Sequence, residues 1–94
     1  GGTGRRGASG AAMIDLLIVE DNERLRPALA AGLDATGAVR VVGACASGEE
    51  ALAACLAAPP AAILMDVQLA GAWNGVEAAQ AIRREFPRMP VVFY

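Results

Sequence analysis

The chain contains neither lysine nor histidine, and all eight of its basic residues are arginine. Within these 94 residues, this excludes histidine acid–base chemistry, zinc sites built on histidine, and any mechanism that needs a lysine amine. A formal net charge of only −2, with no basic face, argues against nucleic-acid contact by this segment. No apolar run reaches membrane-spanning length, so we predict a cytoplasmic protein that does not contact a membrane.

Cysteine is also scarce. Cys45 and Cys55 are the only two, and they lack the spacing of a CxxC motif. Both lie in apolar surroundings, so we interpret them as small buried hydrophobic residues of a reducing compartment, not as a disulfide or a metal site.

The chain is short enough for a single domain. Residues 1–12 are rich in glycine, alanine, arginine and serine without periodicity, and we expect a disordered N-terminal tail there. From residue 13 to residue 94, short apolar runs alternate with helical patterns. We expect strands at residues 14–19, 39–44, 61–65 and 90–94, with one helix between each consecutive pair.

Polar residues mark where two of these helices begin. Ser47 with Glu50, and Asn74 with Glu77, have the three-residue spacing of a capping box. In a capping box, the first side chain accepts a hydrogen bond from the helix backbone, and the second side chain accepts one from the backbone N–H of the first residue. We therefore predict helix starts at residues 47 and 74.

The first helix is expected to be capped by Asn22 or Asp21. Arg24 and Arg26 follow at once, and we interpret both as solvated charges on the helix face, with kinase docking as the less favoured role.

Strands that alternate with helices predict an α/β fold with a parallel sheet, right-handed crossovers and strands buried on both faces. Three acids follow two of the predicted strands: Glu20 and Asp21 after the first, and Asp66 after the third. If the first strand lies between the second and third, these acids share the crevice where such folds bind ligands. Neighbouring carboxylates repel one another unless a proton or cation enters, and Mg²⁺ prefers oxygen ligands.

Five segments in this order resemble the receiver domain of bacterial two-component response regulators. They are LIVEDN (17–22), ASGEEA (46–51), LMDVQL (64–69), NGVEA (74–78) and PVVF (90–93). The resemblance covers residues 13–94 and implies a flavodoxin-like (CheY-like) doubly wound parallel sheet, incomplete, with four strands and three helices.

The resemblance also implies roles for individual residues. Asp66 would be the phosphoacceptor, receiving a phosphoryl group from a sensor histidine kinase or a phosphotransfer protein. Mg²⁺ would be held by Glu20, Asp21 and Asp66, with Asp21 a direct ligand and Glu20 acting directly or through water. The backbone carbonyl of Gln68 would complete the protein ligands. Turnover of an external substrate is not expected, so the chain is not predicted to be an enzyme.

Two departures from the family pattern lie in the loop after Asp66. Ala70 occupies a position that is usually proline, and the loop over residues 69–74 holds one extra residue. Trp73 lies in this insertion, and we interpret it as an aromatic side chain that covers local core, in preference to a partner contact.

The largest departure is that the sequence ends after the predicted fourth strand. The family continues with a Thr or Ser, a helix, a fifth strand ending in Lys and a final helix. We therefore expect a longer natural product, and a dimer through the missing C-terminal face of the full-length protein is left open. Residues 91–94 would form an exposed apolar edge, and the isolated chain is predicted to be marginally stable or prone to aggregation.

Two other functions compete with this prediction. A degenerate receiver, which keeps the fold as a non-phosphorylated interaction module, is favoured by the missing Thr and Lys. A small phosphatase of the haloacid-dehalogenase type would need a second acid two residues after the nucleophile, where Gln68 stands, and it ranks last.

Overall fold

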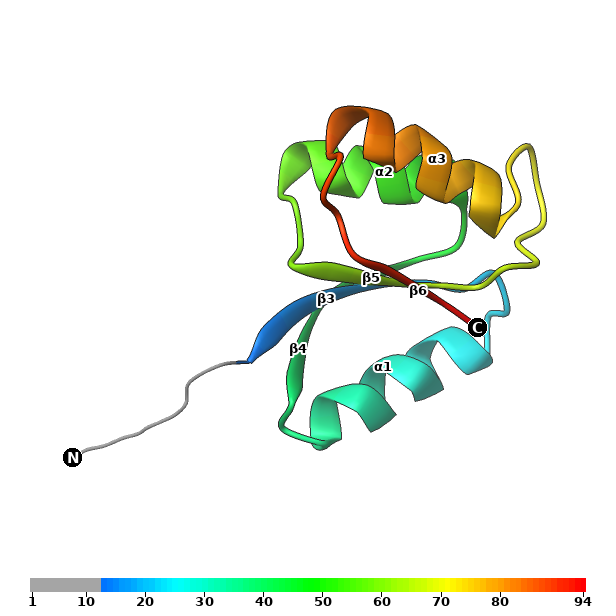
Figure 1. Cartoon of the computed structure of the whole chain (residues 1–94). Coiled ribbons are helices and arrows are strands. Elements are labelled where there is room, and N and C mark those ends of the chain that lie inside the picture. The colour runs from blue at the N-terminus through cyan, green and yellow to red at the C-terminus, as the bar shows by residue number, and fades with distance from the viewer. Residues whose placement is uncertain (1–12) are drawn as a thin grey trace.

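The computed structural model describes residues 13–94 as three layers. A central sheet is covered by α2 (Gly48–Ala57) and α3 (Gly75–Glu85) on one face and by α1 (Leu25–Ala35) on the other (Figure 1). The expected tail over residues 1–12 lies outside the described residues. No helix in the described part combines the length and the apolar character that crossing a membrane requires.

The sheet consists of β3 (Ile14–Val19), β4 (Val39–Cys45), β5 (Ala62–Met65) and β6 (Val91–Phe93). All its pairs are parallel and the spatial order is β4-β3-β5-β6. Each strand begins and ends within one residue of its predicted bounds. This is the order of a flavodoxin-like sheet, in which the chain moves from β3 to one side and then crosses to the other.

The hydrophobic core lies between the sheet and the α2–α3 layer. Its fully buried members include Val19, Cys55, Ile63, Met65 and Ile82. Helix α1 contributes no buried residue, so it covers the opposite face only loosely. The two faces of the sheet are therefore packed very differently.

The expectation that every strand is buried on both faces is wrong for the outer strands. In β3, the four residues from Leu16 to Val19 are all buried. In β4, half-buried and exposed residues alternate, and in β6 Val92 and Phe93 are exposed. The cause is position, because β4 and β6 flank the sheet while β3 and β5 lie inside it.

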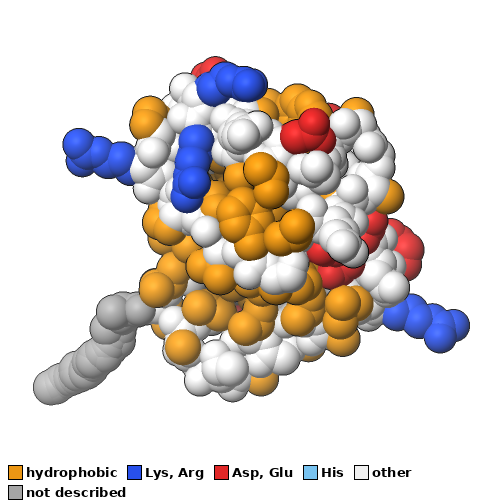
Figure 2. All heavy atoms as spheres, turned by 45° about the vertical axis from the view of Figure 1, so that its right-hand side comes forward, with side chains coloured by type: hydrophobic (Ala, Val, Ile, Leu, Met, Phe, Trp, Pro, Cys, Tyr) orange, Lys and Arg blue, Asp and Glu red, His pale blue; other side chains and the backbone are white. Residues whose placement is uncertain are grey.

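Exposed apolar surface accompanies the outer strand β6. Val92 is 58% exposed, and Phe93 and Tyr94 also rank among the exposed large hydrophobic residues. Figure 2 shows hydrophobic side chains gathered across the middle of one face of the molecule, with acidic side chains along its edge. The predicted exposed apolar edge is present at residues 92–94, whereas Val91 is half-buried against the core. The effect of this edge on stability stays a prediction.

The starts of α2 and α3 follow the sequence signals with one exception. Asn74 and Glu77 form the predicted capping box at the start of α3. Ser47 Oγ accepts a hydrogen bond from the Glu50 N–H, as predicted for α2. The carboxylate of Glu50, however, accepts from the N–H of Ala46 and not from that of Ser47, so the second half of that capping box was predicted one residue too late.

Candidate functional site

The three acids predicted to converge follow two adjacent parallel strands at the same end of the sheet. Glu20 follows β3, and its N–H donates to the carbonyl of Cys45 at the end of β4. The N–H of Asp66, which follows β5, donates to the carbonyl of Val19 at the end of β3. These bonds continue the strand ladders by one residue and place the acidic residues beside each other.

Glu20, Asp21 and Asp66 each have one carboxylate oxygen in a cluster, and these three oxygens lie within 4.8 Å of one another. The spacing suits a small cation bound by hard oxygen donors, which are the ligands of Mg²⁺. Glu20 is buried and the other two are half-buried, so the cluster opens to solvent on the Asp21 and Asp66 side.

Glu20 is the one buried charged residue of the described chain, with 2% of its surface exposed. Its Oε2 accepts a hydrogen bond from the N–H of Asn22 at 2.9 Å, and its Oε1 accepts one from the hydroxyl of Tyr94 at 2.6 Å. Burial, followed by the hydrogen bond to Glu20, raises the pKa of the Tyr94 phenol above its usual value of 10.0. The phenol is therefore a stable donor at neutral pH.

Each of the other two acids accepts a backbone N–H from the segment after β5. Asp21 Oδ2 accepts from Ala70 at 2.8 Å, which ties this loop to the end of β3. Asp66 Oδ1 accepts from Gln68 at 2.9 Å, within the turn that follows the acid. The bond that the structure gives Gln68 at the cluster is made by its N–H, whereas the predicted metal ligand is its carbonyl, and that role stays a prediction.

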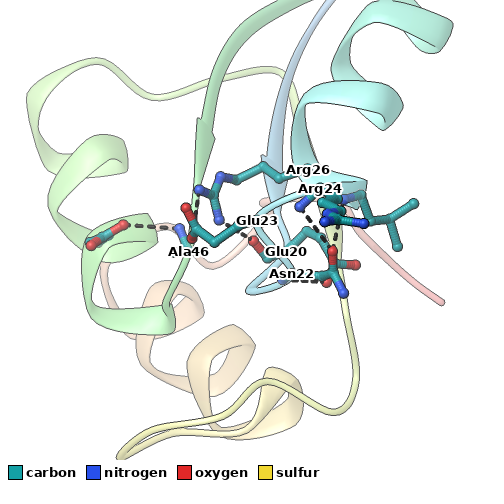
Figure 3. A network of polar contacts seen from close by, with 8 residues as sticks. Glu20, Asn22, Glu23, Arg24, Arg26 and Ala46 are labelled. Carbon is teal, nitrogen blue, oxygen red and sulfur yellow. Dashed lines mark hydrogen bonds and ion pairs between the residues drawn. The ribbon is translucent and has the colours of Figure 1, made fainter.

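The loop between β3 and α1 is held by a polar network (Figure 3). Asn22 Oδ1 accepts from the N–H groups of Arg24 and Leu25, at 2.9 and 2.8 Å, and so holds the turn that precedes α1. The N-cap position of α1 is Arg24, whose side chain makes no capping bond, so the cap was predicted two residues too early. Asp21, the other candidate cap, belongs instead to the acid cluster.

Arg26 is not the solvated charge that the sequence pattern predicted. Its side chain is 18% exposed, its Nη1 donates to the backbone carbonyl of Glu20, and its Nη2 pairs with Glu23 (Figure 3). The hydrogen bond that the guanidinium donates to Glu23 is the main reason why the pKa of Arg26 is raised. Arg26 thereby fixes the peptide that links the first two acids. Arg24 is exposed, as predicted.

Gly75 is a structural requirement of the site that sequence reasoning did not identify. A Cβ at this position would lie 2.1 Å from the backbone oxygen of Asp66. The N–H of Gly75 also donates to the carbonyl of Val67 at 2.9 Å. The first turn of α3 therefore packs directly against the peptide that carries the third acid. In the sequence, the signal for this close contact was limited to the Asn-Gly pair at residues 74–75.

Trp73 in the loop insertion packs against the hydrophobic core and is half-buried, as predicted. Both cysteines are free, and Cys55 is a buried member of the core, as predicted. Cys45 is half-buried and packs against the core from its edge, so the prediction of a buried residue holds only in part. Burial raises the pKa of the Cys45 thiol from 9.0 to about 11.

An all-parallel α/β sheet with a cluster of acids at the point where the strand order reverses is the architecture of a receiver domain. The sequence matches the response regulator receiver domain family over residues 16–94. The chain therefore belongs to this family, whose members are signalling domains of two-component systems.

Characterised relatives agree with this assignment. The transcriptional regulatory protein LiaR of Bacillus subtilis is 37% identical over 73 residues, covering 78% of this chain and 34% of LiaR. The response regulator protein VraR of Staphylococcus aureus is 37% identical over 79 residues, covering 84% of this chain and 37% of VraR. The chain thus spans about a third of the length of these relatives.

A solved structure agrees with the fold. A two-component response regulator of the LuxR family from Aurantimonas superposes with a TM-score of 0.81 at 22% identity, over 87% of this chain and 58% of that one.

Proposed function

We propose that this chain is a phosphoacceptor receiver domain, which takes a phosphoryl group from a histidine kinase onto Asp66 with the help of Mg²⁺. The observation that carries the proposal is the convergence of three carboxylates, from the ends of β3 and β5, within 4.8 Å. Family membership supports the reaction class, since receivers act in two-component signalling. Residues 13–94 would form the part of the receiver domain present in this sequence.

The donor set fits Mg²⁺, because carboxylates are hard oxygen ligands and a cluster of three acids carries charge that a divalent cation offsets. Asp21 and Asp66 would be direct ligands, with Glu20 beside them and the carbonyl of Gln68 as a further donor. When bound, Mg²⁺ would neutralise charge on the phosphoryl oxygens and help to hold them in line.

The chain's own residues supply the nucleophile and its orientation. A carboxylate oxygen of Asp66 attacks phosphorus, a P–O bond to the aspartate forms, and the bond from phosphorus to the donor's leaving group breaks with its electron pair. The product is an acyl phosphate on Asp66. The N–H of Gln68, which donates to Asp66 Oδ1, would orient the carboxylate and leave Oδ2 for the attack.

The partner would be a sensor histidine kinase or a phosphotransfer protein, and we propose that no external substrate is turned over.

Incubation with acetyl phosphate and Mg²⁺, followed by intact mass spectrometry, tests the proposal. The wild-type chain should gain one phosphoryl group, and Asp66→Asn should gain none. Asp15→Asn is the matched control. Asp15 is an acid of β3 that forms an exposed ion pair with Arg40, and it is not part of the acid cluster.

Chelation of Mg²⁺ should lower the yield of the adduct by more than about tenfold. An adduct that persists in Asp66→Asn would contradict the assignment of the phosphoacceptor. A wild-type chain that binds Mg²⁺ but forms no adduct would favour the degenerate interaction module.

A further inference from the structure

The β5–α3 loop, which covers residues 66–74, supplies hydrogen-bond donors to two of the three acids. The N–H of Gln68 donates to Asp66 Oδ1 at 2.9 Å, and two residues later the N–H of Ala70 donates to Asp21 Oδ2 at 2.8 Å. The first bond is local, whereas the second joins residues 49 positions apart and links the end of β3 to the loop after β5. One loop therefore holds an acid from each strand.

The β5–α3 loop is fixed on both sides of Ala70. Before it, Leu69 is a buried member of the hydrophobic core, with 6% of its surface exposed. After it, Trp73 packs against the same core, and a Cβ on Gly48 at the start of α2 would lie 3.3 Å from its ring. Ala70 itself is exposed. The place of its N–H is thus set by its neighbours and not by its own side chain.

The bond from Ala70 acts on an acid that has reason to turn away from the cluster. Asp21 is half-buried, and neighbouring carboxylates repel one another, so an unbonded Asp21 side chain would turn toward solvent. A hydrogen bond from an N–H to an ionised carboxylate is charge-assisted and opposes this movement. Because a carboxylate has two oxygens and about four lone-pair sites, the bond fixes its direction and still allows it to bind a cation.

Resting on the proposed Mg²⁺ site, we propose that Ala70 is a positioning residue, whose N–H holds the Asp21 carboxylate in the orientation that binds the ion. The N–H acts through Asp21 and touches neither the ion nor the phosphoryl group. A side chain that is already ordered costs less to bind, so the bond raises the affinity for Mg²⁺. Asp66 has its own donor in Gln68, so its attack on phosphorus is unaffected once Mg²⁺ is bound.

A backbone ester at residue 70, made with lactic acid in place of alanine, tests this role, because it removes the N–H and keeps the methyl side chain. The dissociation constant for Mg²⁺, measured by titration calorimetry, should rise about fivefold, which corresponds to the cost of ordering one free side chain. The rate of adduct formation from acetyl phosphate at saturating Mg²⁺ should stay within about twofold of the wild type.

Two substitutions at the same position complete the comparison. Ala70→Pro removes the same donor and should show the same separation of affinity from rate. Ala70→Ser is the matched control, because it keeps the N–H at an exposed position and should bind Mg²⁺ as the wild type does. Where the ester and Ala70→Pro differ, the ester decides, because proline also restricts the backbone.

The ion-free chain offers a second readout. Hydrogen exchange of the Ala70 N–H, followed by nuclear magnetic resonance without Mg²⁺, should be faster in Asp21→Ala than in the wild type, because the acceptor is lost. Equal exchange rates would show that the bond does not hold Asp21, and would overturn the role proposed for Ala70.

The binding results separate this role from the proposed function. If the ester binds Mg²⁺ as tightly as the wild type or more tightly, Ala70 does not position Asp21. If its rate at saturating Mg²⁺ falls as much as its affinity, the whole site is distorted, which also contradicts a role confined to Asp21. A wild-type chain that binds no Mg²⁺ would contradict the proposed metal site itself, and the role of Ala70 would fall with it.

Discussion

The contact between Gly75 and Asp66 predicts a large loss of stability in Gly75→Ala. The added Cβ would lie 2.1 Å from the Asp66 oxygen and 2.9 Å from both the carbonyl carbon of Asp66 and the Cα of Val67. All three are backbone atoms, so no side-chain rotation relieves the overlap. The first turn of α3 would have to move away from residue 66 by more than about 1 Å before ordinary packing is restored.

The magnitude follows from what that movement breaks. Overpacking in a buried contact costs about 1–3 kcal/mol. The hydrogen bond from Gly75 to Val67 is strained by the same shift, and its loss costs about 0.5–1.5 kcal/mol. We therefore expect the free energy of unfolding to fall by about 2–4 kcal/mol, a large fraction of the stability of a small domain.

Urea unfolding followed by circular dichroism measures this difference, with Gly32→Ala as the matched control. Gly32 lies in α1, and a Cβ there would meet nothing within 4 Å. The control should stabilise the chain by about 0.5–1 kcal/mol, because alanine is the better helix former. If Gly75→Ala were as stable as the wild type to within about 0.5 kcal/mol, the packing argument would be refuted.

Two further predictions concern the first turn of α3 and the half-buried thiol. Asn74→Ala removes the side chain that caps α3 and should lower the free energy of unfolding by about 1 kcal/mol in the same assay, whereas no change would show the cap to be dispensable. Because burial raises the pKa of Cys45 from 9.0 to about 11, the thiol stabilises the fold fully below pH 9, and this contribution is lost as the pH rises toward 11. Between pH 9 and pH 11, the free energy of unfolding should therefore fall less in Cys45→Ala than in the wild type. Equal losses would contradict the raised pKa of Cys45.

The sequence was sufficient to predict the strands and helices, because each carries a local signal. Apolar runs predict the strands, and the side chains of Ser47 and Asn74 accept bonds from the helix starts that follow them. Gly37, just beyond α1, adopts a φ of 75°, a conformation in which glycine is favoured. Because signals of this kind involve residues that are close together in the sequence, the sequence alone is enough to predict the elements they mark.

The convergence of the three acids was also predictable, because parallel strands end at a common edge. The position of Glu20 and Asp21 directly after one apolar run, and of Asp66 directly after another, placed them at that edge once the strand order was assumed. This assumption was necessary, because a strand order in which β3 and β5 are not neighbours would have separated Asp66 from Asp21, which lies 45 positions earlier in the sequence.

The tertiary structure alone decided which side chains serve that cluster. In the sequence, Arg26 has the pattern of a surface charge and Tyr94 that of the end of an apolar strand. In the structure, Arg26 donates to the backbone carbonyl of Glu20, and Tyr94 donates to the carboxylate of Glu20. The exposure of β4 and β6 was decided in the same way, by their outer positions in the sheet. Sequence patterns therefore determined the elements and the acids that follow them, whereas contacts between distant segments depend on packing geometry that no local pattern encodes.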